Sequence, residues 1–276
     1  SNAANAGITI AANGTASIIN NTTYYASYTQ TVTATFHYYA RKTATSSATR
    51  YMNYAGTYIH ANISLPSAVS SSAGPSSTTF SHVATSKTGA AVSPTTATLT
   101  YYTVYRKTVT ANKFIYKNRS TKSTGAAYGY YDGTTAGATI NLGTAPANGY
   151  TFRGWRTSIV PTGTINVSPN GNVTIVNDTN YYAAYSYTVY LYYNLNGGSG
   201  SISATSGTAY MNYSGDKYAA TVYLTSRTPS RSGYTFDGWY TSASGGSYTS
   251  GSLALTSDYT LYAQWTKDTG IDFINV

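Results

Sequence analysis

Cysteine and glutamate are both missing from the 276-residue sequence, and only 8% of the residues are charged. The absence of cysteine excludes disulfides, thiolate metal sites and thiol nucleophiles together. The absence of glutamate, a strong helix former, argues against a helical protein. No run of eighteen apolar residues occurs, so the sequence predicts no transmembrane segment.

Tyrosine dominates what is present, because the chain has 32 tyrosines together with abundant Thr and Ser. These residue types favour strands. An apolar share of 41% and an aromatic share of 15% argue against disorder in spite of the low charge. The composition therefore predicts a folded, mostly β protein whose surface is polar rather than charged.

An internal repeat organises the chain. Tyr25, Tyr102, Tyr182 and Tyr262 occupy equivalent places in YYASY, YYTVY, YYAAY and LYAQW, and successive ones are 77, 80 and 80 residues apart. That period is too long for a solenoid repeat and long enough for a small domain. The predicted divisions are 1–29 for a tag remnant and the second half of a truncated repeat, 30–106 for a degenerate first repeat, 107–186 for the second, 187–266 for the third and 267–276 for an unassigned tail.

The half-repeat near the start of the sequence aligns without a gap, residues 8–32 on residues 165–189. Asn13-Gly14 and Asn170-Gly171 lie between alternating apolar residues in the two copies, which predicts a hairpin turn in each. The natural protein is expected to be a monomer. Residues 8–29 lack their covering strands, so they are expected either to pack on the first complete repeat or to pair with the same segment of a neighbouring molecule, and truncation favours the second. Ser1-Asn2-Ala3 are typical of a cleaved affinity tag, so any signal peptide is expected outside this sequence.

Each complete repeat is predicted to contain the same order of segments. It opens with an alternating strand, passes through a segment containing Gly and Asn and a short middle strand, and closes on an aromatic stretch and the Tyr-rich strand. The segments after Tyr51 and Tyr210 are expected to be loops or a short helical turn, and the middle strands are expected at 63–65, 140–142 and 222–224. The predicted inward-facing positions of the opening strands are Val32, Ala34, Phe36, Tyr38, Val109, Ala111, Ile115, Val189, Leu191, Tyr193 and Leu195.

The third repeat resembles the Listeria–Bacteroides repeat, the B-repeat of internalins, through LNGG at 195–198, GYTFDGWYT at 233–241 and TLYAQW at 260–265. The second repeat keeps GYTFRGW at 149–155, whereas the first has His82-Val83 in place of Gly-Trp. The resemblance implies tandem small β-grasp-like (ubiquitin-like) repeat domains in an elongated array. It also implies a bacterial surface protein, hence an extracellular, cell-surface or cell-wall location, and no catalytic activity.

The tryptophans allow two interpretations, a carbohydrate platform or core packing. Trp155 and Trp239 follow glycine at the same repeat position, where the first repeat has Val83. A position that accepts valine suits a buried side chain better than a sugar platform, so we predict core packing. Trp265 alternates with Leu261 and Ala263 and is predicted to pack on its strand as well.

Catalytic groups are scarce. His37, His60 and His82 all fall in the first repeat, which contains no Asp or Glu, so neither a Ser-His-Asp triad nor a carboxylate dyad can form within it. We therefore expect no enzyme activity, no catalytic residues, no cofactor and no metal site.

Charge is distributed unevenly, at +5, +5 and 0 for the three repeats and −1 for the tail. Lys113, Lys117, Arg119 and Lys122 form a basic cluster in or beside one strand, which marks them as candidate contacts for an anionic partner such as teichoic acid, a sulfated glycan or a membrane surface. The alternative is an edge strand that its lysines protect from pairing. Nucleic acid is not expected, because no recognition motif accompanies the charge.

Together these features predict a non-catalytic repeat region of a secreted or wall-attached bacterial protein. It would act as a stalk or spacer, with adhesion as an additional role. The alternative is a module that binds glycans or an anionic wall polymer, in which case host-surface or cell-wall glycans are the expected partners.

Overall fold

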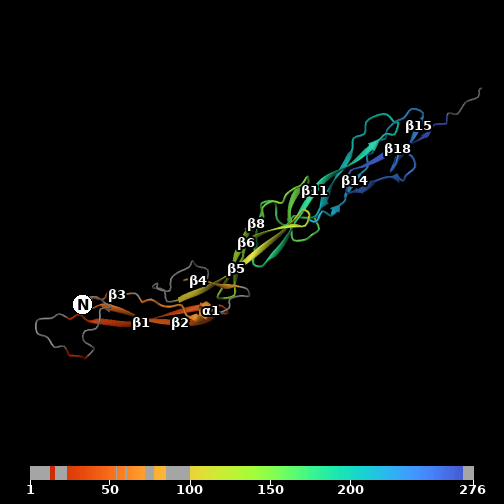
Figure 1. Ribbon diagram of the computed structural model, residues 1–276. Coiled ribbons are helices and arrows are strands. Elements are labelled where there is room, and N and C mark those ends of the chain that lie inside the picture. Colours follow the sequence, from red (N-terminus) through yellow and green to blue (C-terminus); the bar gives the residue numbers. More distant parts are fainter. Residues whose placement is uncertain are drawn as a thin grey trace, which may run out of the picture. The chain divides into compact units, whose positions relative to one another are not determined.

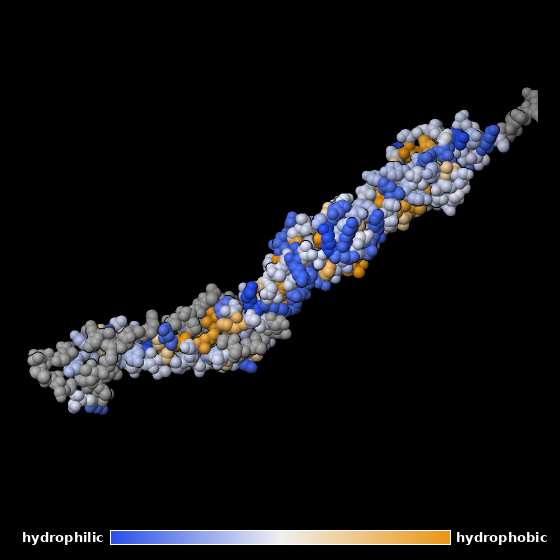
Figure 2. Space-filling view, viewed as in Figure 1, coloured by the Kyte–Doolittle hydropathy of each residue, from blue (hydrophilic) through white to orange (hydrophobic). Residues whose placement is uncertain are grey.

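The computed structural model describes residues 13–15, 24–53, 55–59, 61–71, 78–84 and 100–269 (Figure 1). The described residues are mostly β, with one short helix, as the composition predicts. The chain divides into two compact units, an N-terminal unit of residues 1–109, 124–139 and 174–177 and a C-terminal unit of residues 110–123, 140–173 and 178–276. On the face shown in Figure 2, hydrophilic residues are interspersed with smaller hydrophobic patches.

Four strands contribute residues to both units. They are β5 (Thr100–Ile115), β6 (Arg119–Tyr130), β8 (Ala138–Asn141) and β10 (Asn172–Ile175).

The N-terminal unit also contains β1 (Ser27–Tyr38), β2 (Lys42–Asn53), β3 (Tyr58–Ile59), α1 (Ser67–Ser71), β4 (Thr79–Ala84) and β7 (Thr135–Ala136). β1 pairs antiparallel with β2 and parallel with β5, and β4 pairs antiparallel with β5. Ala34 and Phe36 of β1, both fully buried, join Val69 of α1 in the core. The inward face predicted for this opening strand is therefore confirmed.

The C-terminal unit contains, in addition, β9 (Thr151–Arg156), β11 (Thr179–Asn194), β12 (Thr205–Met211), β13 (Lys217–Tyr218), β14 (Ala220–Tyr223), β15 (Tyr234–Tyr240), β16 (Tyr248–Thr249), β17 (Ser252–Leu255) and β18 (Tyr259–Lys267). In the third repeat β11 pairs antiparallel with β12 and parallel with β18, and β18 pairs antiparallel with β15. The small sheet of β14 and β17 contributes to the same core as the large sheet. Gly207 lets the two sheets approach, because a Cβ there would lie 2.9 Å from Val222 Cγ2.

The long strand β11 belongs to two repeats. Its first residues pair with β9 and with β5 of the second repeat, and its later residues pair with β12 and β18 of the third. The boundary predicted between residues 186 and 187 thus lies inside one continuous strand. Side chains on its buried face, Val189 and Leu191, alternate as the sequence pattern predicts.

The middle strand predicted at 63–65 is wrong, because these residues form no strand. Pro66 follows directly and accepts a hydrogen bond from Val69 N at 2.9 Å, which starts α1. Proline has no N–H to donate to a strand ladder, and its fixed φ suits the start of a helix. Ile63 is nevertheless buried. The other two middle strands are present as β8 and β14.

The segments after Tyr51 and Tyr210 are tight turns between strands, so the loop prediction is confirmed and the helical alternative is wrong. The Asn212 side chain holds the second turn together, since its Oδ1 accepts hydrogen bonds from the backbone N–H groups of Ser214, Gly215 and Asp216 at 2.9–3.0 Å. These bonds are local, which explains why the sequence alone specifies the turn.

Asn170-Gly171 forms the predicted turn, with Asn170 at φ 60°, but not the predicted hairpin. Val167, before the turn, bridges to Trp155, whereas β10, after it, pairs with β8. The turn itself docks on Gly143, whose carbonyl accepts a hydrogen bond from Asn170 N at 2.9 Å. Pairing with other segments has replaced the local hairpin. Asn13 also has a positive φ of 60°, but most of the half-repeat at 8–29 lies outside the described residues.

Within the part of the chain that the structure describes, no helix has the length and apolar character needed to cross a membrane.

Candidate functional site

The four basic residues that the sequence groups together lie in different surroundings. Lys113, on β5, points inward: its Nζ donates a hydrogen bond to the Leu142 carbonyl at 3.2 Å and lies 6.0 Å from the centre of the Trp155 ring. Partial burial lowers the pKa of the Lys113 ammonium from its ordinary value. This side chain takes part in core packing.

Lys117, Arg119 and Lys122 are exposed at and after the turn between β5 and β6. Two of them contact Tyr116. Lys117 Nζ lies 5.6 Å from the centre of its ring, and Arg119 Nε donates a hydrogen bond to its backbone carbonyl at 3.3 Å. The structure thus brings Lys117 and Arg119 together around Tyr116 and turns Lys113 toward Trp155. A surface contact with an anion is open to the three exposed residues.

Replacing Lys113 with phenylalanine should raise the free energy of unfolding by about 1 kcal/mol. The strand registers make Lys113 equivalent to Phe36 and Tyr193, which are aromatic and pack in their cores. Because the native pKa of Lys113 is lowered, the unfolded chain binds more protons, and the stability of the parent should rise as pH climbs through the lowered pKa toward 10.5. Urea denaturation at neutral and alkaline pH would measure both effects. A loss of stability in Lys113→Phe at every pH would contradict this account.

The tryptophans lie in the cores, as predicted. Trp155 is fully buried and Trp239 is 5% exposed. Trp155 Nε1 donates to the Gly143 carbonyl at 3.0 Å, so its polar atom is satisfied inside. Trp265, half-buried, packs against the core of the third repeat and donates to the Leu195 carbonyl at 3.1 Å.

Two of the three histidines have stacking or hydrogen-bond partners in the structure. His37 stacks on Tyr102 with ring centres 5.1 Å apart, and His82 shares a 3.0 Å hydrogen bond with the neighbouring Ser81 hydroxyl. His60 lies outside the described residues. Across the residues that the structure describes, His and Asp side chains form no group of three that could hold a metal ion.

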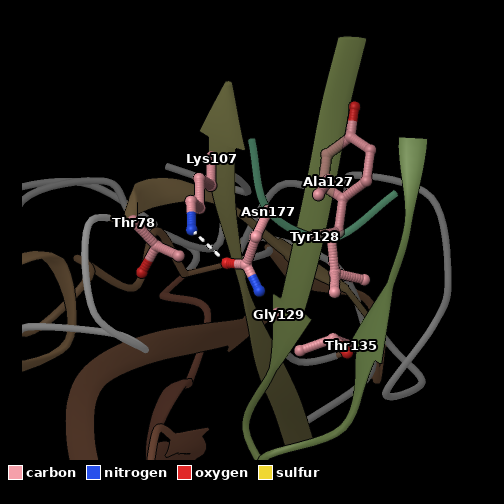
Figure 3. Close-up of a pocket in the computed structure, with 8 residues that line it drawn as sticks. Thr78, Lys107, Ala127, Tyr128, Gly129, Thr135 and Asn177 are labelled. Carbon is pink, nitrogen blue, oxygen red and sulfur yellow. Dashed lines mark hydrogen bonds between the residues drawn. The ribbon is translucent and has the colours of Figure 1, made fainter. Parts of the chain in front are cut away.

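A pocket of about 310 Å³ lies in the N-terminal unit, where the first repeat meets the second (Figure 3). Lys107 of β5 lines one side, and its Nζ donates a 2.7 Å hydrogen bond to Asn177 Oδ1. Thr78 and Thr135 are its other polar lining residues. The remaining wall consists of Tyr128 together with Ala127, Gly129 and Val176. The pocket thus combines one cation, one amide and a mainly apolar wall.

The equivalent place between the second and third repeats, in the C-terminal unit, is filled by aromatic rings. β4 pairs with β5 as β9 pairs with β11, and these registers make Lys107 equivalent to Tyr187. They also make Thr78 equivalent to Tyr150. The rings of Tyr150 and Tyr187 pack edge to face with centres 5.4 Å apart, and the Tyr187 hydroxyl donates to the Thr256 carbonyl at 2.8 Å. Lys and Thr at these positions leave the first site open.

Gly129 is a third residue that leaves the first site open where the equivalent site is filled. The pairing of β6 with β7 matches that of β12 with β13 and of β2 with β3, so Gly129 is equivalent to Met211 and Met52. Met211 is 1% exposed and fills its site. Sequence reasoning missed this pocket because Lys107 lies outside the basic cluster. In addition, the three residues that open the pocket, Thr78, Lys107 and Gly129, are far apart in the chain. Alignment of the repeats does show each replacement, but their proximity requires the strand registers.

Residues 187–264 match the family of the Listeria-Bacteroides repeat domain. The matched segment is almost the whole of the third repeat and less than a third of the chain. The resemblance found in its motifs is therefore confirmed for this segment. Listeria-Bacteroides repeats are typical of bacterial surface proteins. No curated protein and no solved structure shows significant similarity to the chain.

The segment matched to the Listeria-Bacteroides repeat begins in the middle of β11 and ends in β18. It contains Trp239 and its core, and also Tyr187, whose ring fills the place equivalent to the pocket. It contains neither Lys107 nor the basic cluster. The open pocket and the exposed basic residues are thus features of this chain outside the matched repeat.

Proposed function

We propose that this chain is the repeat region of a bacterial surface protein and acts as a non-catalytic stalk or spacer, built as an elongated array of β-grasp-like domains. The observation that carries the proposal is β11, which ends the second repeat and begins the third without a linker. A shared strand resists bending because bending would break its backbone hydrogen bonds. The sheet order β12-β11-β18-β15, with a parallel central pair, supports the β-grasp-like assignment.

Aromatic contacts between successive repeats support the same role. Tyr213 of the third repeat packs on Phe114 and Tyr182 of the second, with ring centres 5.7 and 5.1 Å away. The Tyr213 carbonyl accepts a hydrogen bond from Asn118 N at 3.4 Å. Within the N-terminal unit, Tyr131 packs in the same way on His37 and Tyr102. Repeats joined by a strand and a ring cluster suit a protein that must hold other domains at a distance.

The spacer proposal predicts a radius of gyration well above about 19 Å, the value for a compact globule of this length. Small-angle scattering of the dilute protein would measure it. A radius close to 19 Å would contradict the elongated array.

A second candidate function, binding of a glycan or an anionic wall polymer, is favoured by the exposed cluster of Lys117, Arg119 and Lys122. If it holds, the protein should be retained on immobilised teichoic acid at physiological salt, and changing these three residues to Gln should abolish retention. Lys113→Gln is the matched control, because this side chain points toward Trp155 and its loss should leave retention unchanged. Failure of the parent to be retained would leave the spacer role alone.

A further inference from the structure

We propose that the pocket around Lys107 binds one carboxylate-bearing monosaccharide unit, such as a uronic acid. This goes beyond the spacer role and is independent of it. It also differs from polymer binding by the exposed cluster, since Lys117, Arg119 and Lys122 do not line the pocket.

The anion would bind at the Lys107 ammonium. An ammonium group has three N–H donors, and Asn177 Oδ1 accepts one of them at 2.7 Å. This bond fixes the ammonium at the pocket wall, as Figure 3 shows. Because this partner among the described residues is a neutral amide, the ammonium keeps its charge for a carboxylate.

The rest of the pocket suits a sugar ring. A volume of about 310 Å³ is at the small end of ligand pockets and admits a single ring. Tyr128 offers an aromatic face and Val176 an aliphatic one for the C–H groups of a pyranose. Thr78 and Thr135 are further polar residues that line the pocket. A carboxylate, ring hydroxyls and C–H faces on one small body are the features of a sugar acid.

The charge of the N-terminal unit favours an anionic ligand over a neutral or cationic one. Its sequence holds six Lys and Arg residues against a single acid, Asp132. Such an excess raises the local concentration of anions and speeds their association. By contrast, Tyr187 occupies the equivalent place at the next junction, so the sugar acid should bind only at the first.

The test is a calorimetric or NMR titration of the whole chain at low salt with methyl glucuronide, and in parallel with methyl glucoside, in which a neutral hydroxymethyl group replaces the carboxylate. We expect millimolar affinity for the glucuronide, and we expect the glucoside to bind at least about tenfold more weakly. Lys107→Met should weaken glucuronide binding about tenfold. Gly129→Met, which restores the residue of the other repeats, should fill the pocket and abolish it.

Lys42→Met is the matched control, because it removes the same charge from an exposed position on β2, in the same unit but outside the pocket, and should retain binding within about twofold. Melting temperatures would show whether the variants are folded. If Gly129→Met does not fold, Lys107→Met still tests the proposal. Equal affinity for the two sugars, an equal loss in Lys42→Met, or no glucuronide binding at all would each overturn the proposal. None of these results would alter the scattering test of the spacer role.

Discussion

Replacing Trp239 with alanine is expected to destabilise the third repeat by about 3–5 kcal/mol. The indole is 5% exposed and contacts Tyr193 and Phe236, with ring centres 4.7 and 5.3 Å away. Removing it would leave a cavity between the large sheet and β14, whose walls are held by the strands and cannot collapse fully. Denaturant unfolding followed by circular dichroism would measure the loss.

Tyr223→Ala is the control for this prediction. Tyr223 lies on β14 in the same repeat but is 71% exposed, so its removal should change the free energy of unfolding by no more than about 0.5 kcal/mol. Equal stability of Trp239→Ala and the parent, with loss of binding to a glycan, would show instead that the indole is a sugar platform.

The burial of the tryptophans could be predicted because the repeats supply an internal comparison. Val83, Trp155 and Trp239 occupy one repeat position, and only a core site accommodates all three. The registers agree, since Val83 pairs with Thr103, Trp155 with Ala183 and Trp239 with Ala263. Alternation likewise identified the buried faces of the opening strands. Neither signal requires knowledge of which strands pair, and side-chain period fixes which face is buried.

Strand pairing could not be predicted in the same way. Asn170-Gly171 has the sequence of a hairpin turn, yet β10 pairs with β8 and not with the residues before the turn. β8 lies about 30 residues before β10 in the chain, and a local sequence pattern does not indicate which segment a strand pairs with. For the same reason the sequence places a boundary at residue 186 but does not show that β11 continues through it.

Of the two candidate sites, the surroundings of Lys113 could be predicted in part from the sequence, whereas the pocket at Lys107 could not. Lys113 alternates with the inward-facing Ala111 and Ile115, which places it on the inner face of its strand, and the structure shows its ammonium near Trp155. The pocket at Lys107 depends on the proximity of β5, β6 and the segment after β10. Proximity of this kind follows from the assembled sheet and not from spacing in the chain.

Replacing Gly154 with alanine is expected to cost about 3–5 kcal/mol, more than the same change at the equivalent Gly238. Both glycines lie at bulges before a core tryptophan, with φ of 140° and 134°, a conformation that strains any other residue. They differ in what an added Cβ would meet. At Gly154 it would lie 2.6 Å from the Val167 carbonyl oxygen, which accepts a 2.8 Å hydrogen bond from Trp155 N and cannot move without breaking it.

At Gly238 the added Cβ would meet the Tyr248 ring, which is 60% exposed and can swing into solvent. Gly238→Ala should therefore cost mainly the backbone strain, about 1–3 kcal/mol. Urea titrations of the two variants would compare them directly. Gly251→Ala, where φ is 73° and the added Cβ meets nothing within 4 Å, measures the cost of a positive φ without a clash. If Gly154→Ala loses no more stability than Gly238→Ala, backbone strain rather than the fixed carbonyl explains why glycine precedes tryptophan in these repeats.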